Sequence, residues 1–182
     1  MSTGRKHPRA LPYLFFSEMW ERFGYYLMIG IFLLYLKNVE HGFAMTTKEA
    51  SDLYGTFIAL VFLTPFLGGL LADRYFGYRK SIIAGGLMMG AGYCLMGIHN
   101  LPVLYLSMTL VIVGNGFFKP NISTLLGNLY STPEFQQRKD EGYNIFYMGI
   151  NIGAFICNFF SAAIIIVWGW KYAFVAAGIG MF

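Results

Sequence analysis

Five long apolar runs constrain the fold of this chain more than any other feature. They cover approximately residues 11–36, 51–72, 82–98, 101–126 and 143–168. A helix that crosses a bilayer needs about 17–25 mostly apolar residues, so each run is close to or above that length. Only 12% of the residues are charged, whereas soluble domains have about 25%. Because lipid offers no hydrogen bonds to the backbone, we expect an all-α membrane protein that spans the lipid bilayer.

A sixth apolar segment is much shorter than the others. It starts near residue 172 and reaches Phe182, the last residue. At 1.5 Å per residue it covers about 16 Å, roughly half of the 30 Å hydrocarbon core. A helix that ended there would leave carbonyls facing lipid. We therefore expect one domain over residues 1–182, a six-helix bundle truncated within its sixth helix (partial span 172–182).

The basic residues gather on one side of the expected spans. Three precede the first run, three lie in the loop 73–80 and two in the loop 127–142, but only three lie at the opposite ends. Because Lys and Arg are enriched in cytoplasmic loops, eight against three predicts a cytoplasmic N-terminus for a multi-pass cell-membrane protein. Since these charges lie at span ends, the net charge of +4 does not indicate nucleic-acid binding.

Three charges lie inside the first run. Glu18, Glu21, Arg22 and Tyr25 are spaced i, i+3, i+4 and i+7, so a helix places them on one face. A charge at mid-bilayer costs roughly 2.5–3.5 kcal/mol and is kept where it pairs or faces a wet cavity. One interpretation is an ion pair that only orients helices. We favour the other, in which one acid pairs with Arg22 and the second exchanges a proton.

A further charge, Lys119, lies inside the fourth run. It is about 12 Å from the cytoplasmic end of its span, at 1.5 Å per residue. That is far for a lysine side chain to reach a lipid headgroup. We therefore expect a cation that points into the bundle and is available to a carboxylate.

Polar residues follow one face of the fifth run, at i, i+3, i+7 and i+14. They are Asn144, Tyr147, Asn151 and Asn158. Hydrogen bonding between helices would explain one asparagine, but four such residues favour a face that lines an aqueous cavity. Tyr25 and Tyr26 lie deep in the first run, and we expect them to face the same cavity rather than the membrane interface.

The loop between the second and third runs combines glycines with charges. Asp73 and Arg74 end one expected helix, and Arg79 and Lys80 begin the next. One interpretation is a solvated basic loop. The sharper one is a charge network that holds one conformation shut, with glycines permitting the tight turn.

Four motifs in order now carry a resemblance to known families. The loop that ends in Asp73-Arg74-Tyr-Phe-Gly77-Tyr-Arg79-Lys80 resembles the signature loop of the major facilitator superfamily. The other motifs resemble signatures of its proton-dependent oligopeptide transporter (POT) family. They are Glu18-x-x-Glu21-Arg22-Phe-x-Tyr25-Tyr26, Phe118-Lys119-Pro120-Asn121 and Phe146-Tyr147-Met-Gly-Ile-Asn151-x-Gly153.

The resemblance implies a twelve-helix transporter of which this chain is most of the N-terminal six-helix bundle. The C-terminal bundle, absent from this chain, would be its main partner. The implied activity is proton-driven uptake of di- and tripeptides by alternating access, with the proton as coupling ion and no cofactor. The chain would therefore not be an enzyme. No cluster of metal ligands or activated nucleophile in the sequence supports an enzyme either.

The resemblance also assigns roles to individual residues. It implies proton coupling by Glu18, Glu21 and Arg22, with Lys119 paired to that cluster near the peptide carboxylate. The implied substrate-binding residues are Arg22, Tyr25, Tyr26, Lys119, Tyr147 and Asn151. The implied conformational gate consists of Asp73, Arg74, Arg79 and Lys80.

Two departures from the family pattern stand out. The three histidines (His7, His41 and His99) lie in or near loops, so the histidine that some members have in span two is absent and carboxylates must carry the proton. Several peptide-transporting members have a tyrosine where this chain has Phe62. This difference leaves the exact peptide preference open. Relatives of the family move nitrate, other small anions or drugs, so an alternative with the same fold is transport of another small solute, such as nitrate or a drug-like anion. A structural subunit without transport activity would have no reason to keep the buried charges.

Overall fold

The computed structural model describes residues 7–182, and within that range the regular structure is entirely helical. The elements are α1 (Leu11–Lys37), α2 (Thr47–Leu71), the π-helical turn η1 (Ala72–Phe76), α3 (Tyr78–Met96), α4 (Leu101–Leu129), the 3₁₀ turn η2 (Gln136–Arg138), α5 (Lys139–Trp168) and α6 (Trp170–Ile179).

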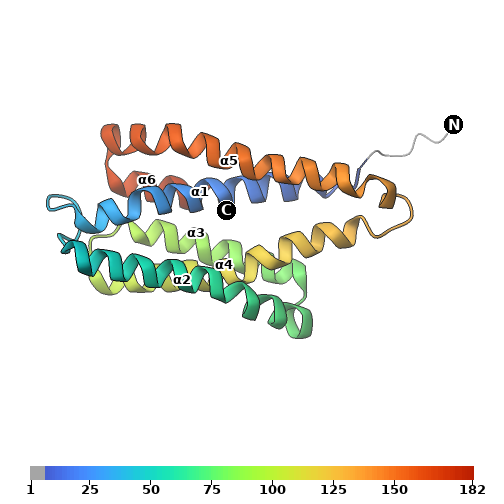
Figure 1. The fold of residues 1–182 in the computed structure, drawn as a ribbon, viewed down its shortest axis with the longest axis horizontal. Coiled ribbons are helices and arrows are strands. Elements are labelled where there is room, and N and C mark those ends of the chain that lie inside the picture. The colour runs from blue at the N-terminus through green and yellow to red at the C-terminus, as the bar shows by residue number, and fades with distance from the viewer. Residues whose placement is uncertain (1–6) are drawn as a thin grey trace.

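The helices form two groups that pack side by side. Figure 1 shows α1, α5 and α6 on one side and α2, α3 and α4 on the other. The most extensive contacts are those of α3 with α4, α1 with α5, and α2 with α4. Helix α6 packs on both α1 and α3 and so joins the two groups. The arrangement is the all-α bundle that the apolar runs predict.

Several helices begin one turn before the apolar run that predicted them. Helix α2 starts at Thr47 rather than 51 because Thr46 caps it. The Thr46 hydroxyl accepts a hydrogen bond from the Glu49 amide (3.3 Å), and the Thr46 amide donates to the Glu49 carboxylate (2.9 Å). This capping box satisfies the first backbone donors of the helix. Helices α3 and α5 likewise begin with polar turns, at Tyr78 and Lys139.

Three helical segments of the described chain are both long and apolar enough to cross a bilayer. They are Thr47–Phe76, Leu101–Leu129 and Gln136–Trp168. Helix α1 has 27 residues, a spanning length, but it carries the charged cluster. Large apolar side chains are exposed along α2 and α5, including Phe66 (76%) and Ile166 (82%). Such a surface is stable against lipid or another helical bundle, not against water.

Glycines permit two close helix crossings. A Cβ atom at Gly153 of α5 would overlap the Met19 carbonyl oxygen of α1. A Cβ atom at Gly68 of α2 would overlap the Gly116 carbonyl oxygen of α4. Small residues at helix interfaces let backbones approach in this way. The two crossings place α1 against α5, and α2 against α4, at the level of the charged residues.

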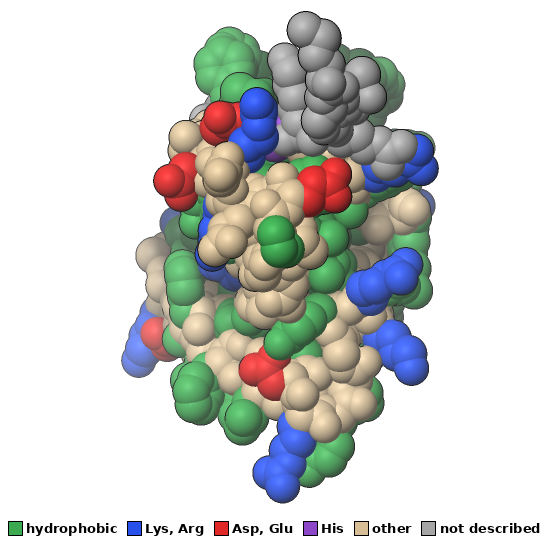
Figure 2. All heavy atoms as spheres, turned by 90° about the vertical axis from the view of Figure 1, so that its right-hand side faces the viewer, with side chains coloured by type: hydrophobic (Ala, Val, Ile, Leu, Met, Phe, Trp, Pro, Cys, Tyr) green, Lys and Arg blue, Asp and Glu red, His purple; other side chains and the backbone are tan. Residues whose placement is uncertain are grey.

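The two ends of the bundle differ in charge. Figure 2 looks at the end that carries residue 7 and the α2–α3 and α4–α5 loops, and shows Lys and Arg side chains around it with Asp and Glu among them. The opposite end has three basic residues, Lys37, Lys48 and Lys171. The structure thus gathers the basic loops at one end, as the sequence predicts.

Candidate functional site

The three charged residues of α1 form one buried cluster. Glu18, Glu21 and Arg22 are exposed by only 4%, 0% and 6%. Arg22 Nε lies 3.3 Å from Glu18 Oε1 and also forms a hydrogen-bonded ion pair with Glu21 Oε2. A single nitrogen of the guanidinium therefore contacts both carboxylates, whereas we expect from the sequence that Arg22 pairs with one acid.

The charges of this cluster do not cancel when all three members are ionised. Two carboxylates and one guanidinium sum to −1, and an uncompensated buried charge is costly. Binding one proton would make the cluster neutral without breaking the Arg22 pair to the other acid. The arrangement can therefore take up and release a single proton.

Lys119 of α4 lies near two aromatic rings, one of which is also close to Arg22 of the cluster. Its Nζ atom lies 5.9 Å from the Tyr25 ring centre and 5.2 Å from the Phe62 ring centre. The Arg22 Cζ atom lies 5.0 Å from the same Tyr25 ring. Both distances to Tyr25 are within the range of cation–π attraction, about 6 Å. Tyr25 is thus a shared neighbour of two cations.

The expected pairing of Lys119 with the α1 cluster is not formed in this conformation. No ion pair within 4.0 Å joins Lys119 to any carboxylate of residues 7–182. The reason is geometric, because Arg22 already engages both acids while the lysine lies against Tyr25 and Phe62. Lys119 is half-buried, so its ammonium group can bind a carboxylate of a ligand or of another helix.

Hydrogen bonds at a junction between α2 and α4, close to Pro65, position Phe62 and Lys119. Pro65 has no N–H group, so the Val61 carbonyl one turn before it lacks its helical donor. Asn115 of α4 supplies a donor instead, with its Nδ2 atom 2.8 Å from Val61 O. Thr64 Oγ1 also donates across the junction, to Ile112 O (2.9 Å). The two helices are therefore joined by hydrogen bonds about one turn from Phe62 and Lys119.

The polar stripe of α5 is open at the surface of this chain. Asn144, Tyr147 and Asn151 are exposed, as is Tyr26 (39%) of α1, while the side chain of Asn158 lies outside the described residues. Of the expected substrate-binding residues, Tyr26, Tyr147 and Asn151 can thus meet a ligand or another bundle. Arg22 and Tyr25 cannot, because both are buried in this conformation.

The expected gate residues lie in an exposed turn. Asp73 and Arg74 belong to η1, and Arg79 and Lys80 open α3, with Gly77 between them at φ 76°. All four are exposed. Within residues 7–182 none of them takes part in an ion pair, so the predicted charge network is not formed by this chain on its own. The gate itself stays a prediction.

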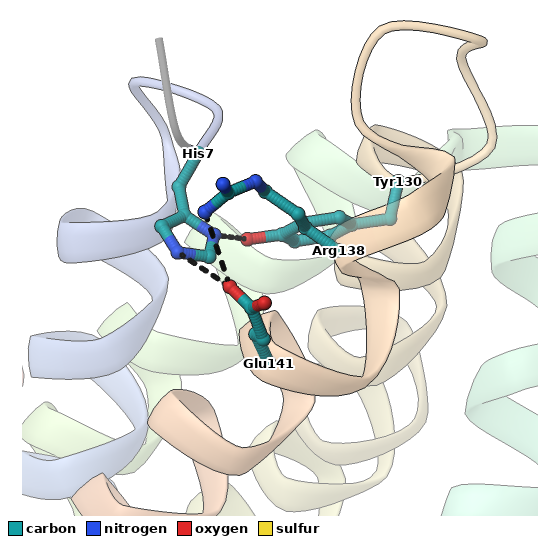
Figure 3. A network of polar contacts seen from close by, with 4 residues as sticks. All are labelled: His7, Tyr130, Arg138 and Glu141. Atoms are coloured by element: carbon teal, nitrogen blue, oxygen red, sulfur yellow. Dashed lines mark hydrogen bonds and ion pairs between the residues drawn. The ribbon is translucent and has the colours of Figure 1, made fainter.

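Sequence reasoning missed a polar network at the end of α4. His7 Nδ1 lies 2.7 Å from Tyr130 Oη, and His7 Nε2 lies 3.7 Å from Glu141 Oε2 (Figure 3). Arg138 Nη1 also approaches Glu141 Oε2, at 3.3 Å. Burial and the nearby Glu141 carboxylate raise the pKa of Tyr130. A single histidine before the first helix gave no pattern from which this link to α4 and α5 could be found.

Comparison with known families identifies the architecture. The model of the family described as Major Facilitator Superfamily matches residues 20–182. The chain belongs to this superfamily. Its all-α fold is therefore that of a major facilitator bundle, as expected from the loop around Asp73.

Relatives within the superfamily are transporters. The uncharacterised transporter YclF of Bacillus subtilis is 37% identical over 96% of this chain and 36% of its own length. The peptide transporter YePEPT of Yersinia enterocolitica is 33% identical over 96% of this chain and 35% of its own. A crystal structure of the peptide transporter POT in complex with sulfate superposes with a TM-score of 0.90 at 37% identity, covering 97% of this chain and 36% of that one.

These relatives, which are transporters themselves, confirm the resemblance to the POT family. The chain spans about a third of the length of the relatives it matches. Its helices α1 to α6 correspond to that part of a major facilitator transporter.

Proposed function

We propose that this chain forms the N-terminal bundle of a proton-coupled symporter that takes up di- and tripeptides. The observation that carries the proposal is the buried Glu18–Glu21–Arg22 cluster, whose charges do not balance. Its likeness to peptide transporters supplies the substrate class. No cofactor takes part in the proposed mechanism, and the proton is the coupling ion.

In the proposed mechanism the proton and the peptide bind as linked events. A proton on one acid neutralises the α1 cluster and weakens its hold on nearby cations. Lys119, which makes no ion pair within residues 7–182, then binds the peptide carboxylate in a site of low dielectric constant. Because the two binding events favour the same state, each strengthens the other by the same factor.

The remaining substrate contacts come from the open face of the chain. Tyr26, Tyr147 and Asn151 offer hydroxyl and amide groups at exposed positions of α1 and α5, and Lys119 of α4 is half-buried. A second bundle would cover this face and complete the peptide site, and rocking of the two bundles would expose the site to each side in turn. Tyr25 and Arg22 would join the site in a state that uncovers them.

The basic end of the bundle sets its proposed orientation. Lys and Arg gather at the end that carries residue 7 and the two basic loops, and such loops are retained in the cytoplasm. The N-terminus would therefore be cytoplasmic, in the plasma or inner membrane. Asp73, Arg74, Arg79 and Lys80 would form a cytoplasmic gate by pairing with the second bundle.

One observation favours a second candidate, transport of a small anion with few hydrogen-bonding groups. Phe62, exposed by 63%, lies 5.2 Å from Lys119 where several peptide-transporting members of the family have a tyrosine. A phenyl ring leaves the lysine as the main anchor of that region. An anion such as nitrate would need no more than this cation.

Uptake of alanyl dipeptide into proteoliposomes tests the proposal. The native protein that carries this chain would be reconstituted, and an inward proton gradient imposed. We expect stimulated uptake that is lost in Lys119→Ala and kept in Lys139→Ala, a control at an exposed lysine. Gradient-driven transport of nitrate with no response to peptides would favour the second candidate and contradict the first.

A further inference from the structure

A tyrosine on α3 has a buried hydroxyl group without a protein partner. Tyr93 is 0% exposed, and its Oη atom makes no hydrogen bond to any residue of the described chain. Buried tyrosine hydroxyls usually find a partner, because an unpaired buried polar group is costly. Packing of the ring alone therefore does not explain why a tyrosine, with its hydroxyl group, occupies this position.

The position of Tyr93 is next to the charged turn of α1. Its Cε2 atom lies 3.1 Å from where a Cβ atom at Gly24 would be, so glycine is what lets the ring come this close. Glu21 lies three residues before Gly24, and residues so spaced are neighbours on a helix face. Tyr93 is also within electrostatic range of both Glu21 and Arg22.

The α1 cluster has unpaired atoms of its own. Within the described residues, three of its buried polar atoms lack a hydrogen-bond partner. They are Glu18 Oε2, Glu21 Oε1 and Arg22 Nη2. A carboxylate oxygen accepts and a phenolic hydroxyl donates. A donor without an acceptor on α3 and acceptors without a donor on α1 are therefore both buried where Tyr93 packs against α1.

We propose that Tyr93 is a positioning residue of the proton site, whose hydroxyl donates a hydrogen bond, directly or through one water molecule, to the Glu21 carboxylate and so sets the pH at which the cluster takes up its proton. The inference rests on the proposed role of the α1 cluster in proton coupling. It adds a third helix to that site.

The consequence for proton uptake has a definite sign. A hydrogen bond to an ionised acceptor is stronger than one to a neutral group, so the hydroxyl favours the deprotonated cluster. Removing it leaves the carboxylate less stabilised. The cluster should then take up its proton at a higher pH.

Infrared titration of the native protein in lipid tests this inference without any substrate. The signal is the C=O stretch of the protonated carboxyl group, assigned to the cluster by its loss in Glu18→Gln or Glu21→Gln. In Tyr93→Phe we expect the titration midpoint to rise by about one pH unit, equivalent to about 1.4 kcal/mol. The control is Tyr35→Phe, a tyrosine that is also buried but packs among Phe43, Trp170 and Phe174, and it should keep the wild-type midpoint.

Several results would overturn the inference. They are an unchanged or lowered midpoint in Tyr93→Phe, or an equal rise in Tyr35→Phe. Phenylalanine keeps the ring of Tyr93 and removes only its hydroxyl group, so the packing is retained and the variant should fold. Lower thermal stability with an unchanged midpoint would make Tyr93 a packing residue only.

The test separates this inference from the proposed substrate. A higher midpoint in Tyr93→Phe alone, in a protein that does not transport peptides, would keep the role of Tyr93 and discard the peptide. Absence of any titrating carboxyl band that depends on Glu18 or Glu21 would overturn both the inference and the proposed proton coupling.

Discussion

Tyr25 holds two cations of the candidate site in place at once. The Arg22 guanidinium and the Lys119 ammonium lie 5.0 and 5.9 Å from the centre of its ring. Each such contact contributes about 0.5–2 kcal/mol, depending on how far the cation is desolvated. The ring offsets part of the repulsion between the two positive charges and keeps Lys119 close to the cluster. The contacts are to the ring, and because the residue is only 4% exposed, water screens them little.

Two substitutions at Tyr25 separate the ring from the hydroxyl. Tyr25→Phe keeps the aromatic face, and we expect it to retain most peptide affinity. Tyr25→Leu removes the face and should raise the KM for dipeptide uptake by about 2- to 30-fold, equivalent to 0.5–2 kcal/mol. Equal losses in the two variants would show that the hydroxyl, not the ring, carries the effect.

At the scale of helices, the carbonyl groups freed by the two prolines inside helices, Pro65 and Pro120, are covered by a neighbouring helix. In α2, Pro65 leaves the Val61 carbonyl without its helical donor, and Asn115 of α4 replaces that donor. In α4, Pro120 leaves the Gly116 carbonyl in the same position, and Gly68 of α2 packs against it. Freed carbonyls in membrane helices are tolerated when neighbours cover them in this way. The junction therefore fixes α2 against α4 and, with them, the spacing of Phe62 and Lys119.

A double-mutant cycle tests whether Asn115 acts through the Pro65 gap. Asn115→Leu should lower the free energy of unfolding by about 1–3 kcal/mol, because it leaves the Val61 carbonyl without a donor. In a Pro65→Ala background the restored N–H can bond that carbonyl, so the same change should cost less. Unfolding of the four proteins in mixed micelles measures both costs. Equal costs in the two backgrounds would rule out the carbonyl as the cause.

The crossing of α1 and α5 depends on the absence of a side chain at Gly153, and this dependence can be tested. A Cβ atom there would overlap the Met19 carbonyl, so Gly153→Ala should destabilise the bundle by about 1–3 kcal/mol. Gly55→Ala on α2 is the matched control, because no atom lies within 4 Å of its added Cβ. Alanine is favoured over glycine in a helix by up to about 1 kcal/mol, so the control should be neutral or stabilising. Similar losses of stability in the two variants would contradict a tight α1–α5 crossing.

For the whole molecule, the apolar runs and the helical spacing predicted a large part of the structure. Run length predicted the helices, and the i, i+3, i+4 spacing predicted that Glu18, Glu21 and Arg22 share one helix face. Both features depend on local geometry, which a sequence carries directly. The starts of α2, α3 and α5 were placed a turn late because polar first turns, such as that after Thr46, contribute no apolar signal.

Contacts between helices were less predictable. The predicted pairing of Lys119 with the α1 acids is not formed in this conformation, because the lysine lies against Tyr25 and Phe62 instead, and it stays a prediction. Tyr93 and His7 were missed, since a single polar residue in an apolar run or before a helix forms no pattern. Which groups meet across two helices depends on rotation and crossing angle. No periodicity within one helix contains that information.

The account as a whole depends on the α1 cluster as the site of the coupling proton. The most direct measurement compares gradient-driven uptake of alanyl dipeptide with its counterflow exchange, in the native protein and in Glu21→Gln. Glutamine cannot exchange the proton, so we predict loss of driven uptake with counterflow retained, whereas Glu40→Gln, at an exposed acid, should behave as wild type. Equal retention of both activities in Glu21→Gln would contradict the account.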